Sequence, residues 1–180
     1  MPDINIESRI NNPRIRKILL IFSSPKTPKQ AAREFNTSRI KLRHFIDENL
    51  IECLNPEAKK GRFYIASEQA RKCLNLFSPE IENCKDWQII GWIISSPRQR
   101  LAIMRCVDER KLASEEIRMR ATQFNSNLTR PATKKTLKHL VQKHLLDSEI
   151  MERVRFYWLN EFGARIKEEL AVIAPNSFNQ

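Results

Sequence analysis

Apolar residues recur along this chain at the spacing of one helical face, and they predict a run of three helices near its start. Apolar side chains at positions 15, 18, 19 and 22 predict a helix over Arg14–Ser23. The stretch "TPKQAAREF" then opens with a Thr-Pro-x-Gln capping sequence, which predicts a second helix from Thr27 to Phe35. Asn36 follows as a turn residue, because asparagine tolerates the left-handed conformation. A third helix is expected over Ser38–Asn49.

The pattern changes after the third helix to short strands around a basic turn. A strand is expected near Ile51–Leu54, and "RFYIA" at Arg62–Ala66 predicts its partner. The turn between them, "EAKKG", ends at Gly61, which allows a tight reversal. Ser67–Leu76 then predicts another helix.

The second half of the chain repeats this order. Four pairs of segments match at offsets of 84, 89, 95 and 93 residues: "PRIRKILLIF" with "PRQRLAIMRC", "EFN" with "QFN", "LRHFIDENLI" with "LKHLVQKHLL", and "RFYI" with "RFYW". An ordered set of matches indicates a duplicated module. The predicted elements of the second copy are helices over Arg98–Glu109, Ser114–Phe124, Thr133–Lys143 and Glu161–Leu170, strands over Leu145–Ile150 and Val154–Leu159, and a turn at Met151–Arg153.

This repetition divides the 180 residues into two small domains. We expect a first domain over residues 1–76, a connector over 77–89, and a second domain over 90–180 that ends in a flexible tail. The connector and the residues after it contain Trp87 and Trp92 among several isoleucines. This apolar segment is expected to pack between the copies, or alternatively to form a homodimer or protein-partner surface.

Helix, helix, turn, helix, hairpin, helix is the order of a winged helix-turn-helix module. The segments quoted above, together with "YIASEQARKCL" and "YWLNEFGARIKEEL" after each hairpin, resemble transcription regulators of the ArsR and MarR type. Gly163 fits the closing motif of that family, whereas Ala70 departs from it. The resemblance implies an α+β fold, mainly helical with small β-hairpin wings, built as two tandem winged helix-turn-helix domains.

In such a module the third helix is the recognition helix, which places its N-terminal residues on base edges in the major groove. With Leu42 inward on that helix, Ile40 and His44 are expected to point outward. The basic hairpin tips are expected to lie along the minor groove or the phosphates. The residues that this arrangement predicts at double-stranded DNA are Thr37, Ser38, Arg39, Lys41, Arg43, His44, Lys59, Lys60, Arg62, Thr133, Lys134, Lys135, Thr136, Lys138, His139, Arg153 and Arg155.

The charge of the chain favours the same partner. Its 32 Lys and Arg against 21 Asp and Glu give a net charge of +11, and a protein this basic is typically a ligand of a polyanion such as nucleic acid. The sequence predicts a sequence-specific DNA-binding transcription regulator in the cytoplasm. Tandem winged domains also serve as protein-interaction subunits or as plasmid-type replication initiators, and these functions remain as alternatives.

Other classes of function lack their sequence signatures. No phosphate-binding loop, dinucleotide fingerprint or paired-carboxylate motif occurs, so we expect no enzyme and no cofactor. The four cysteines form no close pair and are expected to be reduced and mostly buried, with no metal site. No apolar run approaches the roughly 20 residues of a spanning helix, and no signal peptide is recognisable.

Overall fold

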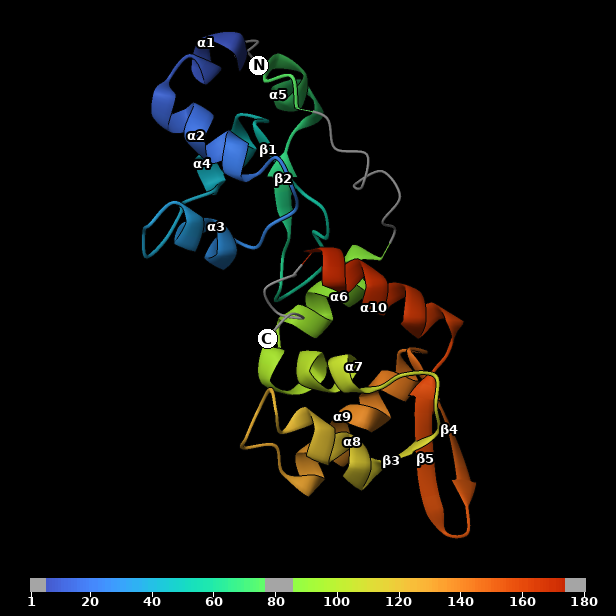
Figure 1. Cartoon of the computed structure of the whole chain (residues 1–180). Coiled ribbons are helices and arrows are strands. Elements are labelled where there is room, and N and C mark those ends of the chain that lie inside the picture. The colour runs from blue at the N-terminus through green and yellow to red at the C-terminus, as the bar shows by residue number, and fades with distance from the viewer. Residues whose placement is uncertain (1–5, 77–85, 174–180) are drawn as a thin grey trace. The chain divides into compact units, whose positions relative to one another are not determined.

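A computed structural model describes residues 6–76 and 86–173, and it divides the chain into two compact units (Figure 1). The division lies between Gly91 and Trp92. That point is inside helix α6 (Trp87–Ile94), two residues after the start expected for the second domain. Most of the expected connector and the expected tail lie outside the described residues. Each unit combines helices with one small antiparallel sheet, which confirms the α+β class.

The first unit is built from short helices around a two-stranded sheet. Its elements are α1 (Ile6–Ile10), α2 (Pro13–Ile21), α3 (Pro28–Glu34), α4 (Arg43–Asp47), β1 (Ile51–Cys53), β2 (Tyr64–Ala66) and α5 (Glu68–Cys73). The predicted capping box of α3 is present, since Gln30 N–H donates to Thr27 Oγ1 at 3.3 Å and Thr27 N–H donates to Gln30 Oε1 at 2.9 Å. Asn36 has the predicted left-handed conformation, with φ at 55°.

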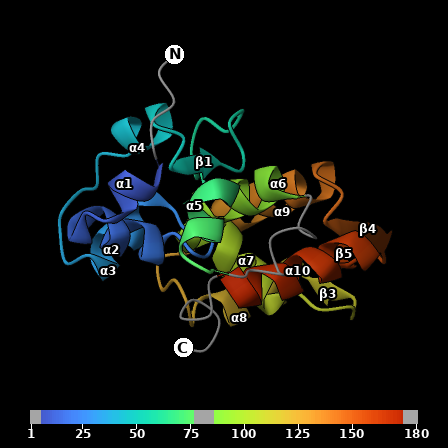
Figure 2. The same ribbon diagram turned by 90° about the horizontal axis from the view of Figure 1, so that it is seen from above.

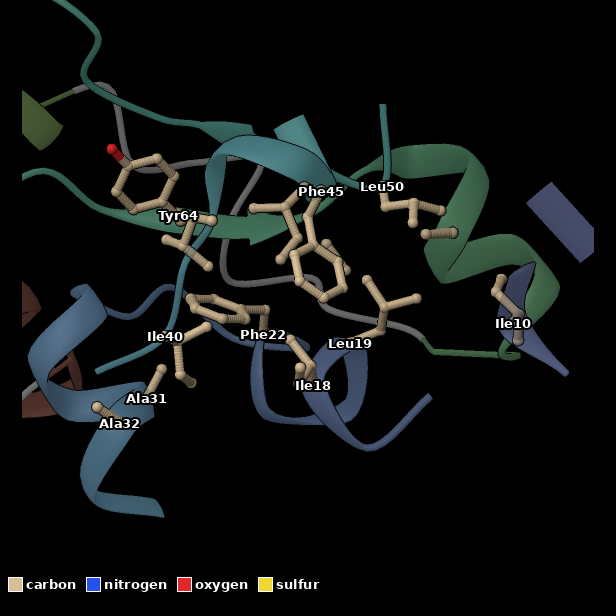
Figure 3. Packing of buried hydrophobic residues seen from close by; sticks show 14 residues of the cluster. Ile10, Ile18, Leu19, Phe22, Ala31, Ala32, Ile40, Phe45, Leu50 and Tyr64 are labelled. Carbon is tan, nitrogen blue, oxygen red and sulfur yellow. The ribbon is translucent and has the colours of Figure 1, made fainter. Parts of the chain in front are cut away.

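The core of the first unit gathers the inward faces of these elements. Phe22, the residue that follows α2, is fully buried between side chains of α2 and of the segment that precedes α4, as the close-up in Figure 3 shows. Leu19 and Leu50 complete this interior, and both are fully buried. In both overall views α2 lies beside α3 (Figures 1 and 2). Burial of such aliphatic and aromatic side chains stabilises each by roughly 1.5–3 kcal/mol relative to exposure.

The second unit has longer elements and a three-stranded sheet. After the end of α6, its elements are a π-helical turn η1 (Pro97–Leu101), α7 (Ala102–Cys106), β3 (Leu112–Ala113), α8 (Ser114–Ala121), α9 (Arg130–Gln142), β4 (Leu146–Met151), β5 (Val154–Leu159) and α10 (Glu161–Ile173). The strands are ordered β3-β5-β4, all antiparallel. In Figure 1 the β4–β5 hairpin extends beyond the helices of its own unit.

The two units share details that the repeat predicts. The ten-residue segment "LRHFIDENLI" ends its helix at Asn49, with φ at 54°, and "LKHLVQKHLL" ends its helix at the equivalent His144, with φ at 55°. In both, the next residue's N–H donates back into the helix, from Leu50 to the Phe45 carbonyl and from Leu145 to the Leu140 carbonyl. The repeated segment therefore terminates a helix and starts a strand in the same way twice.

Equivalent hydrogen bonds also close each unit. Ser67 Oγ accepts from the Ala70 N–H at 3.3 Å, and Asn160 Oδ1 accepts from the Gly163 N–H at 2.9 Å. Tyr64 pairs with Lys26 just before α3, as Tyr157 pairs with Leu112 just before α8. The repeat thus extends from the sequence to the order and the caps of the elements.

Three helix predictions need correction. The third helix of the first copy is only Arg43–Asp47 instead of Ser38–Asn49. The helix expected to reach Glu109 ends at Cys106, because Val107 is extended and Lys167 Nζ donates to the carbonyl of Val107 at 2.7 Å. The helix expected from Thr133 begins at Arg130, since Thr129 caps it and a proline occupies its first turn.

Candidate nucleic-acid interface

Helix α9 of the second unit presents a row of exposed lysines. Lys134, Lys135 and Lys138 are exposed, and within the described chain none of them forms an ion pair. Lys134 and Lys138 lie one helical turn apart, so their like charges repel each other and destabilise the helix by a few tenths of a kcal/mol. An anionic ligand on this face would relieve that repulsion.

Two residues of α9 that were predicted to contact DNA lie instead on its inward face. Thr133 and Thr136 are only 1% and 4% exposed, and they lie with Leu137 and Leu140 on the inward face. Because α9 begins three residues earlier than expected, Thr133 reaches its first turn, where its hydroxyl donates to the Thr129 carbonyl at 3.0 Å. Both threonines are core residues and cannot meet a ligand at the helix surface.

Several other cations of the second unit are held by carboxylates. Arg110 pairs with Asp108, Lys111 with Glu149, Arg120 with Glu116, and Arg165 with Glu169. Exposed Lys143, Arg153 and Arg155 likewise form no ion pair within the described residues, so what sets the α9 lysines apart is that three of them lie close together on one helix.

Glu115 fixes the start of α9. Its carboxylate accepts from Arg118 on α8 and from Arg130 Nε at 3.1 Å, so it connects α8 to the first residue of α9. The hydrogen bond from Arg118, more than that from Arg130, lowers the pKa of the Glu115 carboxyl to about 2. This exposed ion pair connects α8 to the start of the helix that carries the lysines.

The predicted recognition residues of the first unit lie mostly outside any helix. Thr37, Ser38, Arg39 and Lys41 are all exposed, but they belong to the non-helical segment between α3 and α4. Only Arg43, whose side chain is 94% exposed, and His44 lie on α4. The helical recognition surface expected here is therefore absent from the described residues of this unit.

The side chains of this segment alternate between core and surface. Ile40 was expected to point away from the core, but it is 8% exposed and packs in the core with Leu42 (Figure 3). Arg39, Lys41 and Arg43 are exposed between and beside them. A period of two replaces the helical period, because Ile40 and Leu42 are both buried and therefore share one side of the segment.

A hollow of about 490 Å³ lies beside this segment. Its polar lining includes Arg14 at the start of α2 together with Thr37, Arg39 and Lys41, and no acidic residue lines it. Its apolar lining includes Ile18, Phe35 and Phe45. The sequence prediction missed Arg14, because no local pattern in the sequence links position 14 to positions 39–43.

The two histidines in matching positions have different surroundings. His44 Nε2 lies 3.1 Å from Glu48 Oε1 and 2.7 Å from Arg9 Nη2, so it belongs to a polar cluster that joins α1 to α4. Arg9 itself pairs with Glu48. His139 on α9 is half-buried. His44 is 65% exposed and remains accessible, although its ring is engaged on one side.

The first hairpin is held closely by Asn55, which is 1% exposed. Its side chain donates to the carbonyls of Gly61 and Trp87, each at 3.1 Å, and accepts from the Phe63 N–H at 2.8 Å. Among the predicted tip residues, Lys59 and Lys60 are exposed.

Arg62 is also exposed, and its Nε donates to the Ala58 carbonyl at 2.8 Å. Gly61 adopts φ of 70°, and a Cβ there would meet the Gly91 carbonyl oxygen at 2.1 Å. Only glycine fits this turn, which is therefore fixed closely against α6.

The second hairpin is longer and has an apolar tip. Arg153 and Arg155 are exposed as predicted, and Glu152 and Arg153 form a two-residue turn with φ of 50° and 67°. The sequence analysis missed Ile150, Met151 and Val154 beside them, which are 60%, 45% and 44% exposed. In the sequence, these exposed apolar residues are indicated by the adjacent pair Ile150 and Met151, which breaks the alternation of apolar and polar residues next to the turn.

The tryptophans Trp87 and Trp92 do not form the exposed partner surface that the sequence analysis gave as an alternative. Trp87 is 7% exposed, and its ring lies 5.3 Å from that of Phe63. Trp92 is half-buried, with the Arg100 guanidinium 4.2 Å from its ring centroid. Trp87 is therefore a core residue of the first unit, and its indole exposes little surface area to a protein partner.

The described residues contain neither a metal-binding group of side chains nor a membrane-spanning helix. The described ranges hold no group of three or more His, Cys, Asp or Glu side chains that could bind a metal. Cys53 and Cys106 are half-buried, whereas Cys73 is exposed, which the expectation of mostly buried cysteines missed. No helix in the described ranges is long and apolar enough to cross a membrane.

Comparisons with known proteins place the chain in no family. No protein-family model matches the sequence, and no curated protein matches it. Among solved structures, the crystal structure of the DIP2311 protein from Corynebacterium diphtheriae is similar over 86% of this chain, with 18% sequence identity and a TM-score of 0.27. The chain spans only 27% of that protein's chain, and a likeness this weak carries no argument about fold or function.

Proposed function

We propose that the chain is a sequence-specific, double-stranded DNA-binding transcription regulator with two covalently linked winged helix modules. The observation that carries the proposal is the face of α9, where Lys134, Lys135 and Lys138 are exposed and have no carboxylate partner among residues 6–76 and 86–173. B-DNA offers a major groove about 12 Å wide, into which a helix fits with its lysines toward guanine O6 and N7.

The order of elements supports the winged helix assignment. In the second unit, α7, β3, α8, α9, the β4–β5 hairpin and α10 follow one another as in a winged helix-turn-helix. The first unit repeats this order with a shorter third helix and hairpin. Because the two third helices differ in length and in charge, a protein that uses both units prefers an asymmetric DNA site.

The proposal is tested by selecting binding sites from a library of random duplexes and measuring affinity by fluorescence anisotropy. The key variant changes Lys134, Lys135 and Lys138 to alanine. A matched control changes Lys72, Arg110 and Arg165, which are ion-paired, to alanine, so that both variants lower the net charge by three. We expect loss of at least tenfold in affinity for the key variant and near wild-type affinity for the control.

Two results would contradict the proposal. Failure of the wild type to bind any duplex at about 50 mM salt would reject DNA binding, since phosphate contacts are strongest there. Equal losses in both triple variants would show that only net charge matters, and the α9 face would then have no special role.

A protein-binding role is the second candidate, and the β4–β5 tip favours it. Ile150, Met151 and Val154 expose apolar surface at the end of a projecting hairpin. Such a tip is unusual for a protein that contacts only phosphates, and exposed apolar clusters mark interaction sites. Wild-type DNA affinity after Ile150→Ser and Val154→Ser, together with loss of a partner in co-purification, would support this role.

A further inference from the structure

We infer that the two units divide the work on DNA: the first holds the phosphate backbone and the second reads the bases. This inference rests on the proposed function and deepens it, because it names which surface supplies affinity and which supplies specificity. The repeated sequence by itself does not require a division of roles between the units. The division follows from the different lengths of the third helix in the two units.

Within the described residues of the first unit, most of the predicted recognition residues lie outside the third helix, which is too short to carry them into a groove. Helix α4 has five residues and begins at Arg43, so Arg39 and Lys41 precede it. Buried Ile40 and Leu42 hold this segment against the core and leave Arg39, Lys41 and Arg43 outward. Arg39 and Lys41 in the non-helical segment and Arg43 at the first residue of α4 form a short track of charge at every second residue. Arg43 also lies 3.8 Å from Asp47 on the surface. Such a track suits the repeating charge of a phosphate backbone and carries no base-reading geometry.

The hollow beside the track adds a fourth cation. Arg14 comes from α2 and lines the hollow with Arg39 and Lys41, and none of the three is in an ion pair in the described chain. The Thr37 hydroxyl supplies a neutral donor in the same lining. A site with arginine, lysine and hydroxyl donors and without a carboxylate favours a phosphate group.

The second unit differs in the loop between α8 and α9, residues 122–129. Leu128 in that loop is 3% exposed, and Asn125 donates to the carbonyl of Arg98, the residue equivalent to Arg14. The loop therefore lies over the start of the first helix in this copy. Helix α9 begins directly after it and extends for 13 residues, which gives the lysines a rigid frame of the kind that base reading needs.

The inference is tested by comparing two variants on two DNAs across salt. The first variant changes Arg39, Lys41 and Arg43 to alanine, and the second changes Lys134, Lys135 and Lys138 to alanine. Each is titrated against the selected duplex and a scrambled duplex by anisotropy from about 50 to 300 mM salt. Far-ultraviolet circular dichroism of each variant checks that the exposed substitutions leave the fold intact.

The two variants are expected to fail differently. The first loses affinity for both duplexes by the same factor, and its slope of log affinity against log salt falls by up to about 2.7, or about 0.9 for each phosphate that the variant no longer neutralises. The second loses its preference for the selected duplex by about tenfold or more. A third variant, with Arg39 and Arg43 changed to lysine, keeps the wild-type slope, because point charges suffice for phosphates.

Clear results overturn the inference while leaving the proposed function in place. A fall in sequence preference in the first variant, or in the arginine-to-lysine variant, means that the track reads bases. An unchanged slope and affinity in the first variant mean that the track does not touch DNA. Absence of binding by the wild type to either duplex rejects the proposed function itself.

Discussion

Gly163 on α10 is the position where the second unit is most sensitive to a single methyl group. A Cβ placed there would lie 1.9 Å from the carbonyl oxygen of Leu145 and 2.9 Å from its carbonyl carbon. The first of these is about 1.5 Å short of ordinary van der Waals contact, and the blocking atoms belong to the backbone between α9 and β4. Gly163→Ala therefore pushes α10 away from the strand start.

The free energy of unfolding is expected to fall by about 2 kcal/mol. Overpacking of a close contact costs about 1–3 kcal/mol, and the upper end applies because a backbone carbonyl cannot rotate out of the way. Alanine recovers roughly 1 kcal/mol of helix propensity relative to glycine. For a unit of this size the net loss lowers the melting temperature by about 10 °C.

Hydrogen exchange followed by mass spectrometry measures this loss unit by unit. Peptides from α9, β4 and α10 should exchange faster in Gly163→Ala, while peptides from α2 and α3 should not change. Ala70→Gly is the matched control, since Ala70 occupies the equivalent capped position and is fully buried. It should cost about 1 kcal/mol in the first unit alone. A Gly163→Ala protein that is as stable as wild type or more stable would refute the close-contact argument.

Three further predictions concern other parts of the chain. Asn55→Ala removes a buried side chain with three hydrogen bonds and should destabilise the first unit by about 2–4 kcal/mol in urea unfolding; a loss below about 1 kcal/mol would contradict its role. Glu115 has a pKa lowered from 4.5 to about 2, so its stabilisation is full above pH 4.5 and is lost as pH falls toward 2; Glu115→Gln should flatten thermal stability across that window, and an unchanged profile would argue against the pair. Burial raises the pKa of the Cys106 thiol to about 11, so iodoacetamide at pH 8 should label exposed Cys73 well before Cys106, and equal labelling would show that Cys106 is accessible.

The repeat made much of the architecture predictable. Positions 15, 18, 19 and 22 located α2, the Thr27 capping sequence located α3, and "RFYW" located β5 to the residue. These signals are local, because a cap or a strand period is set by residues within one or two turns of each other. The apolar stripe of α9 was likewise visible in the sequence, although its start was placed three residues late.

The sequence could not determine the conformation of the segment before α4, because its residues fit both a helical period and a period of two. The residues from Arg39 to Arg43 fit a helix by analogy with the second copy, but they also alternate in the way an extended segment does. The core decided the outcome, since burying both Ile40 and Leu42 requires them to share one side of the segment. That choice depends on packing against α2, which lies more than 15 residues away in sequence and leaves no local signal.

Hydrogen exchange of the full chain with and without a DNA duplex tests the central claim most directly. A protein that binds DNA as proposed should gain protection in α9 and in the segment from Asn36 to Leu42, and the gain should weaken as salt is raised. Helices α5 and α10 should exchange as in the free protein. An absence of protection anywhere would contradict DNA binding. Protection confined to the apolar tip from Ile150 to Val154 would contradict the account as well and would identify the hairpin as the functional surface instead.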